Sequence, residues 1–235
     1  VSTSMVNRKA AHEVLVERRV LFVVTGFLTL GCLLWIIAMS TDYWGIVDGG
    51  TGVYIPASKH YFLRSYTGIW RTCRTAYENS SKEVITDLCT THRIFTKAKV
   101  PHKSFIDYQR TVASFSIISL LVILMGLVFS GYTFTHTRYM YKRLAACSHL
   151  VAAGCVLIVI EVATSLFHYA AHHMPDRHPP KTNWHYGYSF MLAWVTFIAE
   201  ATATVAFGIC SRKRKKDKAP DDEYAIDEEP TIIGR

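Results

Sequence analysis

Four stretches of about twenty residues carry almost no charge, and they constrain the fold of this 235-residue chain more than any other feature. A helix of that length spans the ~30 Å hydrocarbon core of a bilayer. The stretches are Val20–Met39, Val112–Tyr132, Leu144–Ala171 and Tyr188–Ile209. The sequence therefore predicts a polytopic membrane protein and disfavours a secreted domain, a cytosolic enzyme and a nucleic-acid-binding protein.

Basic residues flank these spans in a pattern that predicts their orientation. Positive residues in short flanking segments stay on the cytoplasmic side of the membrane. They occur before the first span, between the second and third spans and after the fourth, as Arg8, Lys9, Arg18 and Arg19, then Arg138, Lys142 and Arg143, then Arg212, Lys213, Arg214, Lys215 and Lys216. Both termini and the middle connection are therefore predicted to be cytoplasmic, and the last cluster is predicted to face anionic membrane lipid.

The spans and connections divide the chain into nine segments. They are a cytoplasmic N-terminus (1–19), the first span (20–44), a first extracellular loop (45–109), the second span (110–132), a cytoplasmic loop (133–143), the third span (144–171), a second extracellular loop (172–187), the fourth span (188–210) and a cytoplasmic tail (211–235). The tail carries blocks of like charge without apolar periodicity, which is typical of disorder.

The first extracellular loop is predicted to form a small antiparallel β-sheet, because its β-branched and aromatic runs are broken by glycine. Cys73 and Cys89 are the only cysteines in the predicted extracellular sequence, so we expect them to pair and to stabilise the loop by ~3 kcal/mol. Asn79 begins an Asn-Ser-Ser acceptor for an N-linked glycan. The predicted fold is a membrane α+β protein, in which a four-helix transmembrane bundle carries a disulfide-pinned sheet.

Short motifs in and beside this loop resemble a known family. TDYW at residues 41–44 ends the first span, GIWRTC follows at residues 68–73, and Leu88-Cys89 comes later in the loop. This order is similar to the W–GLW–C–C signature of the claudin-like tetraspan superfamily, with isoleucine in place of the usual leucine. The matching residues are Trp44, Gly68, Ile69, Trp70, Cys73, Cys89 and, at the start of the second span, Arg110.

Two motifs of the fourth span narrow the resemblance. YGYSF at residues 186–190 and FIAE at residues 197–200 look like the YGWSF and FIIAE of the transmembrane AMPA-receptor regulatory proteins, which are related to the voltage-gated calcium-channel gamma subunits. The resemblance implies an auxiliary subunit that packs against a pore-forming channel through its third and fourth spans and its extracellular sheet. It favours an AMPA-type glutamate receptor over a voltage-gated calcium channel as host, at the plasma membrane and postsynaptically.

The chain departs from these relatives at two points. Arg74 stands where stargazin-like members have a second consecutive cysteine, so a second disulfide in the loop is not expected. The classical members end in a hydrophobic residue that binds PDZ scaffolds, whereas Arg235 ends this sequence. Binding to a PDZ scaffold is therefore not expected from this terminus.

The signature residues also predict a physical role. Trp44 and Trp70 can bury large apolar faces while each indole N–H finds an acceptor at the membrane boundary. Gly68 allows either a close backbone approach or a positive φ. Arg110 can extend toward the membrane surface and donate to loop carbonyls. We therefore interpret the signature as a set of structural contacts that hold the sheet to the bundle, and not as a recognition site.

Two acidic residues lie inside predicted spans, Glu161 in the third and Glu200 in the fourth. A carboxylate in hydrocarbon costs roughly 3 kcal/mol on insertion scales, so such residues face a partner or a cavity. In the functional interpretation, Glu161 and Glu200 are both candidates for contact with the transmembrane helices of a channel. The structural alternative is a hydrogen bond within the bundle, for example to Thr25, Thr29 or Ser165.

The second extracellular connection is rich in histidine. His168 and His172 have i,i+4 spacing and could share a zinc ion on a helix, although solvated histidines explain the pattern more simply. No hydrolase, metalloprotease or nucleotide-binding motif occurs in the sequence. We expect no enzyme activity, no cofactor and no resident metal.

Two other functions remain open from the sequence. A claudin-type junction protein would form a paracellular barrier or pore, and nine basic against five acidic residues between Gly45 and Gln109 would favour anions. A first loop of about fifty residues is expected of such proteins, and this one is longer. The third alternative is a trafficking chaperone that leaves its partner at the cell surface.

Overall fold

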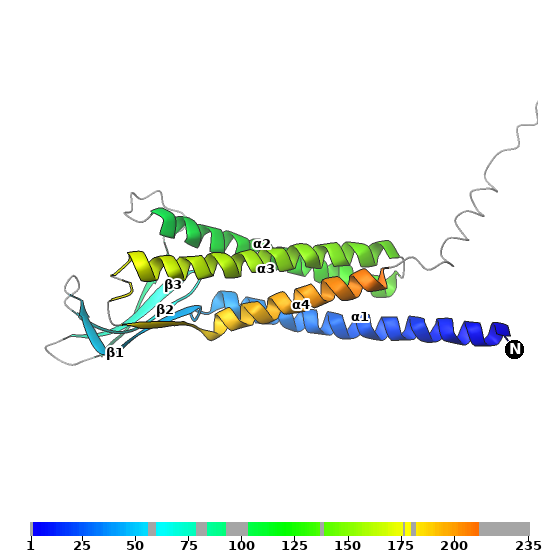
Figure 1. Ribbon diagram of the computed structural model, residues 1–235, viewed down its shortest axis with the longest axis horizontal. Helices are drawn as coiled ribbons and strands as arrows, with labels where there is room; N and C mark the ends of the chain where they lie inside the picture. The colour runs from blue at the N-terminus through cyan, green and yellow to red at the C-terminus, as the bar shows by residue number, and fades with distance from the viewer. Residues whose placement is uncertain are drawn as a thin grey trace, which may run out of the picture.

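The computed structural model describes residues 2–55, 60–78, 84–92, 103–136, 139–175, 177–179 and 182–211. Within these residues, four helices form an elongated bundle and a β-sheet covers one end of it (Figure 1). The helices are α1 (Ser2–Ser40), α2 (Lys103–Thr135), α3 (Tyr139–His173) and α4 (Tyr188–Cys210). All four are long and apolar enough to cross a membrane, which confirms the predicted spans.

The sheet contains five antiparallel strands in the described part of the chain, in the order β4-β3-β2-β1-β5. The strands are β1 (Gly45–Ile55), β2 (His60–Thr67), β3 (Arg71–Glu78), β4 (Val84–Thr91) and β5 (Asn183–Tyr186). The first four follow one another through the predicted loop. The fifth comes from the connection between α3 and α4 and pairs with the start of β1, which the sequence did not predict.

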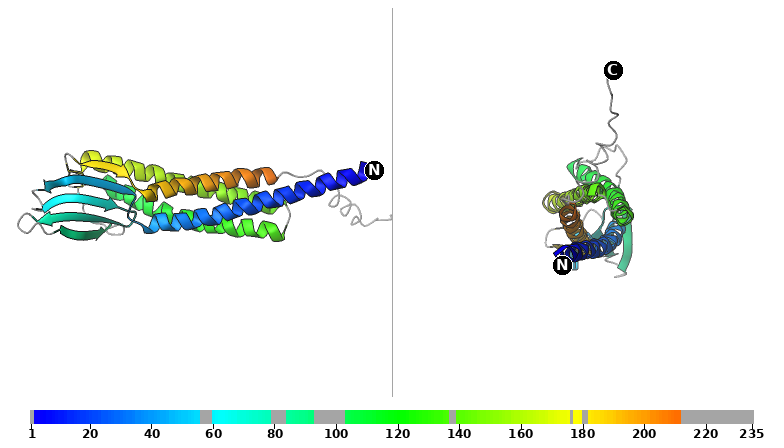
Figure 2. Two further views of the ribbon diagram at one scale, coloured as in Figure 1. Left: turned by 90° about the horizontal axis from the view of Figure 1, so that it is seen from below. Right: turned by 90° about the vertical axis from the view of Figure 1, so that its right-hand side faces the viewer.

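Three of the helices, α1, α2 and α3, begin before the predicted starts of their spans, whereas α4 has its predicted bounds. α2 begins at Lys103, seven residues before the predicted start at 110, and so continues the bundle up to the sheet. α1 ends at Ser40, and the Thr41 side chain and backbone both donate to the Ile37 carbonyl. Its other end projects past the remaining helices at the end of the bundle opposite the sheet, which we call the far end (Figure 2).

The two largest apolar clusters of the described residues hold the helices together. The larger lies toward the sheet and is built around Trp35, Trp44 and Val156, each at most 1 % exposed. The smaller lies toward the far end and contains Leu28 and Phe207. Between α1 and α4 the backbones approach closely, because Gly31 faces the methyl group of Ala199. One of the small residues of α4 therefore serves packing within the bundle.

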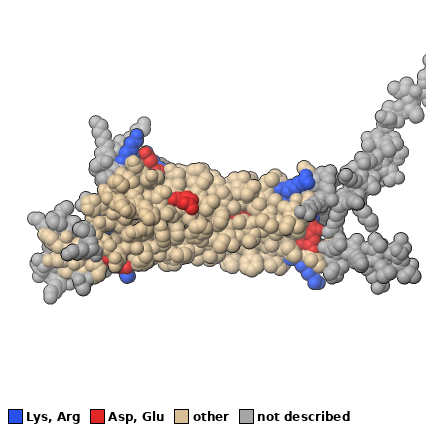
Figure 3. Space-filling view, viewed as in Figure 1, with Lys and Arg blue, Asp and Glu red and all other residues tan. Residues whose placement is uncertain are grey.

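Charged side chains gather mainly near the two ends of the molecule, and on the face drawn in Figure 3 little more than one acidic patch interrupts the uncharged surface between them. At the far end, Lys142 of α3 pairs with Glu17 of α1. On the sheet, Arg64 pairs with Asp48 across β1 and β2. This distribution is the one expected of a bundle whose middle lies in hydrocarbon.

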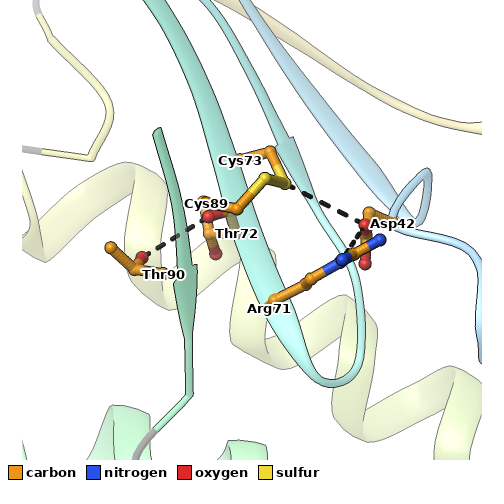
Figure 4. The surroundings of a disulfide bond; sticks show 6 residues. All are labelled: Asp42, Arg71, Thr72, Cys73, Cys89 and Thr90. Atoms are coloured by element: carbon orange, nitrogen blue, oxygen red, sulfur yellow. Dashed lines mark hydrogen bonds and ion pairs between the residues drawn. A yellow bond between two sulfur atoms is a disulfide. The ribbon is translucent and has the colours of Figure 1, made fainter. Parts of the chain in front are cut away.

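The predicted disulfide is confirmed: Cys73 of β3 and Cys89 of β4 are bonded and lie directly opposite each other in the ladder. Asp42 lies beside the bond, with its carboxylate accepting from Arg71 (Figure 4). The disulfide thus joins β3 to β4, and the ion pair connects the sheet to the segment that leaves α1. Asn79 and the basic cluster at 212–216 lie outside the described residues, as does the chain end discussed for PDZ binding.

Candidate functional site

The sheet meets the bundle through two tryptophans of the signature. Trp44 is 1 % exposed, and its indole Nε1 donates to the Ala38 carbonyl at 2.7 Å. Trp70 donates in the same way to the Met39 carbonyl at 2.7 Å. The carbonyls at the end of a helix have no partner within it, so both indoles satisfy acceptors that α1 leaves open. The two tryptophans thereby fix the residue before β1 and the turn before β3 to the last turn of α1.

Glycine occupies two positions in this junction where a side chain would collide with backbone. A Cβ on Gly68 would lie 2.7 Å from the Asp42 Cα, and one on Gly187 would lie 2.0 Å from the Tyr43 carbonyl oxygen. Neither glycine has a positive φ. Of the two roles considered for Gly68, close approach is therefore the one that the structure shows.

The two sequence motifs at residues 41–44 and 186–190 pack against each other although they lie far apart in the chain. Gly187 N–H donates to the Trp44 carbonyl at 3.0 Å. The Tyr43 and Tyr188 rings stack with centroids 5.0 Å apart, and Phe190 meets the Trp44 ring edge to face at 6.3 Å. The start of α4 is therefore part of the same junction as the end of α1.

The remaining signature residues take different positions. Ile69 is 4 % exposed and belongs to the larger apolar cluster. Arg110 is 40 % exposed and lies 3.9 Å from the Asp107 carboxylate on the preceding turn of α2. The role in holding the loop that the sequence suggests for Arg110 stays a prediction.

A cluster of basic side chains lies between the sheet and the ends of α2 and α3. Arg177 places its guanidinium 4.5 Å over the Phe105 ring and 3.5 Å from the Thr72 hydroxyl. Burial, reinforced by Arg74, lowers the pKa of Arg177 to about 10. His92 and His178 lie in the field of Arg177. Burial first and this charge second lower the pKa of each histidine to about 4.

These two histidines predict a stability that depends on pH. An unfolded histidine titrates near 6.5, so between pH 6.5 and 4 the unfolded state binds more protons than the folded state. We therefore expect full stability above pH 6.5. As the pH falls to 4, the free energy of unfolding should fall by about 2 kcal/mol per histidine. The loss from His178 should be the smaller of the two, because this side chain is partly exposed and solvent screens its charge. Thermal unfolding in detergent at pH 7.5 and 4.5 measures this loss. His92→Gln and His178→Gln should each reduce it, and an unchanged pH dependence in the double variant would contradict the assignment.

Three polar side chains form a chain of hydrogen bonds in the centre of the bundle. Glu200 of α4 accepts from His149 Nδ1 of α3 at 2.7 Å, and His149 Nε2 lies 2.8 Å from the Ser130 hydroxyl of α2. All three are 0 % exposed. Gly126 makes room for the imidazole, since a Cβ there would lie 2.8 Å from the ring. The chain connects three helices at one level.

The order serine, histidine, carboxylate is also that of an activated serine nucleophile. Nucleophilic catalysis requires the substrate to reach the hydroxyl, and Ser130 is enclosed by the helices. The arrangement therefore acts as an internal polar connection. The sequence analysis missed His149 and Ser130, although a histidine in an otherwise apolar span is the signal that could have found them.

This geometry corrects the interpretation of Glu200 as a contact for a partner. Its side chain is fully buried and points to His149, so a partner on the outside of the bundle cannot reach it. The structural alternative, a hydrogen bond within the bundle, is the one that the structure shows for Glu200, although its partner is His149 and not one of the residues suggested from the sequence. Thr25, Thr29 and Ser165 each donate to a carbonyl of their own helix, those of Leu21, Gly26 and Glu161 respectively.

Glu161 has the opposite position. It is exposed on the outer side of α3, in the middle of a helix long and apolar enough to cross a membrane. Exposed residues on the same side of α3 include Gly154, Ile158, Ser165 and His168, and we call these four with Glu161 the outer α3 face. A small residue, a carboxylate, a hydroxyl and an imidazole thus interrupt a surface that is otherwise apolar.

Within the described residues, no three His, Cys, Asp or Glu side chains converge around the histidines of the second connection. The rings of His168 and His172 lie with centroids 6.4 Å apart, and His172 Nδ1 lies 2.9 Å from the His168 carbonyl. His168 also packs edge to face on Trp184 of β5.

The chain matches the model of a known protein family. The family described as PMP-22/EMP/MP20/claudin tight junction matches residues 29–208. The matched region contains the disulfide, the junction between sheet and bundle, and the Ser130–His149–Glu200 chain. A search of curated protein sequences finds no match.

Proposed function

The chain belongs to the PMP-22/EMP/MP20/claudin family of multi-pass membrane proteins, and from this premise we propose that it is an auxiliary subunit of a pore-forming ion channel. In this role it carries out no reaction. It binds the channel within the plasma membrane, with the sheet on the extracellular side and both termini in the cytoplasm, and alters gating and surface trafficking.

The host in this proposal is an AMPA-type glutamate receptor, with a voltage-gated calcium channel as the second choice and a postsynaptic location as the consequence. The support is the resemblance of GIWRTC at 68–73 and YGYSF at 186–190 to the receptor-regulating proteins. In the structure these two motifs belong to the single junction that joins the sheet to the bundle.

The observation that carries the proposal is the exposure of Glu161. Against lipid alone, this carboxylate would cost roughly 3 kcal/mol. A transmembrane helix that offers a hydrogen-bond donor at the same depth removes that cost, and Gly154 on the same face allows close helix approach. The outer α3 face is therefore our proposed contact with the channel. It lies on the third span, which is one of the two spans that the resemblance implies as the contact.

The sheet supplies the means of regulation in this proposal. It is held to α1 and α4 by the indole hydrogen bonds and by the backbone hydrogen bond of Gly187. A sheet attached in this way moves with the transmembrane contact. If it touches the channel's outer domain differently in open, closed and desensitised states, it shifts the populations of those states by the difference in affinity.

A claudin-type junction protein is the alternative, as the family match does not separate it from a channel subunit. In that case the excess of basic residues between Gly45 and Gln109, nine against five, would make a paracellular pore favour anions. The outer α3 face would then contact another copy of the chain.

Purification of the protein with its partner tests the proposal. We expect a pore-forming subunit to co-purify with the wild type and to be reduced at least tenfold with Glu161→Leu, by loss of about 1.4 kcal/mol or more of binding free energy. The Glu161→Leu protein should remain folded, because the change removes a charge from an exposed position of a membrane span. Leu121→Ala, at an exposed position of α2, is the matched control and should leave co-purification unchanged. Recovery of cell-junction proteins and further copies of the chain instead would support the alternative.

A further inference from the structure

An apolar groove opens between α1 and α2 at the far end of the bundle. Its volume is about 880 Å³, within the range of roughly 300–1,000 Å³ that is usual for ligand sites. The groove arises because α1 packs mainly on α4 while α2 packs mainly on α3. Phe22 and Phe134 face each other within it, with ring centroids 6.2 Å apart.

Glycines open part of this groove. Gly26 of α1 and Gly131 of α2 line it, and a Cβ at either position would meet nothing within 4 Å. The hydroxyls of Thr25 and Thr29, which also line it, donate to carbonyls of their own helix. The groove therefore suits an apolar chain and does not require a polar ligand along its length.

Charge is confined to one end of the groove, where Arg18 and Arg19 line it. Neighbouring Glu17 pairs with Lys142, and no ion pair of Arg18 or Arg19 occurs within the described part of the chain. The two guanidinium groups are thus available to an anion. Guanidinium groups bind phosphate strongly, through paired N–H donors.

The dimensions match those of one lipid. From Arg18 to Thr29 the helix rises by about 16 Å, at ~1.5 Å per residue, which is about half of the ~30 Å hydrocarbon core. The arginines therefore lie at headgroup depth while the groove extends through one leaflet. In the predicted orientation this is the cytoplasmic leaflet, which is rich in anionic lipid.

We propose that this groove is a binding site for an anionic phospholipid, with its phosphate on Arg18 and Arg19 and an acyl chain between α1 and α2. The lipid fills the space that the two helices leave open and so supports the far end of α1. This site is separate from the outer α3 face and does not depend on which partner that face binds.

Native mass spectrometry of the full-length protein tests the site, with phosphatidylserine and phosphatidylcholine of identical acyl chains as probes. We expect the wild type to retain phosphatidylserine preferentially. Arg18→Gln/Arg19→Gln should lower that retention about tenfold and leave phosphatidylcholine unaffected. Gly26→Leu/Gly131→Leu should fill the groove and lower the retention of both lipids.

Gly208→Leu is the control for the glycine variants, because a Cβ there also meets nothing within 4 Å and it lies in α4 outside the groove. It should bind as the wild type does. Equal retention of the two lipids by the wild type would overturn the proposal, as would unchanged retention in the arginine variant. A dimer that the groove-filling variant abolishes would assign the groove to a second copy of the chain and would also overturn it.

Discussion

Replacing His149 with leucine is expected to lower the free energy of unfolding by about 3–5 kcal/mol, the usual effect of removing one partner from a buried polar pair. The change leaves the Glu200 carboxylate without its described donor, in a position with no access to water. The other carboxylate oxygen of Glu200 already has no hydrogen-bond partner among the described residues, so this group depends on His149.

Chemical unfolding in detergent measures this effect, and the double variant His149→Leu/Glu200→Leu is its control. If the loss arises from an uncompensated carboxylate, the double variant should be more stable than His149→Leu alone. Ser130→Ala should cost only about 1–2 kcal/mol, since it removes a neutral hydroxyl. A double variant as unstable as the single one would mean that packing, and not the polar pair, determines the stability here.

Gly187→Ala is expected to produce the second large effect, a destabilisation of about 3 kcal/mol or more, at the upper end of what overpacking causes. The added methyl group would lie 2.0 Å from the Tyr43 carbonyl oxygen, and backbone cannot rotate away as a side chain can. The start of α4 must then move from the end of α1, and the hydrogen bond from Gly187 to Trp44 is lost with it.

The matched control is Gly208→Ala in α4, the helix that Gly187 precedes, where the methyl group meets nothing. It should leave the melting temperature unchanged or slightly raised, because alanine is the better helix former. Melting in detergent, together with the yield of folded protein at the cell surface, compares the two variants. Equal stability of Gly187→Ala and Gly208→Ala would show that the junction is not as tight as described.

The features that depend on local composition could be predicted from the sequence. Four charge-poor stretches predict four spans because length and apolarity alone decide whether a helix can cross a bilayer. The pairing of Cys73 with Cys89 followed from their isolation on one side of the membrane. The strands of the first loop followed from β-branched and aromatic runs, which need no knowledge of distant partners.

The features that depend on distant pairing could not be predicted. β5 has four residues, and it is ordered by its ladder to β1, about 140 residues earlier in the chain. Likewise, the sequence identifies Glu200 as a costly residue but not which of many polar side chains satisfies it. His149 lies 51 residues away, and only the packing of α3 on α4 brings the two together.

Site-specific photo-crosslinking is the measurement that tests the proposed channel contact most directly. A photoreactive residue at position 165 would lie on the outer α3 face, one turn from Glu161, and one at position 121 on α2 would serve as the control. The account predicts that position 165 crosslinks to a pore-forming channel subunit in native membranes and that position 121 crosslinks only to lipid. Crosslinking of position 165 to lipid alone, or only to another copy of the chain, would contradict it.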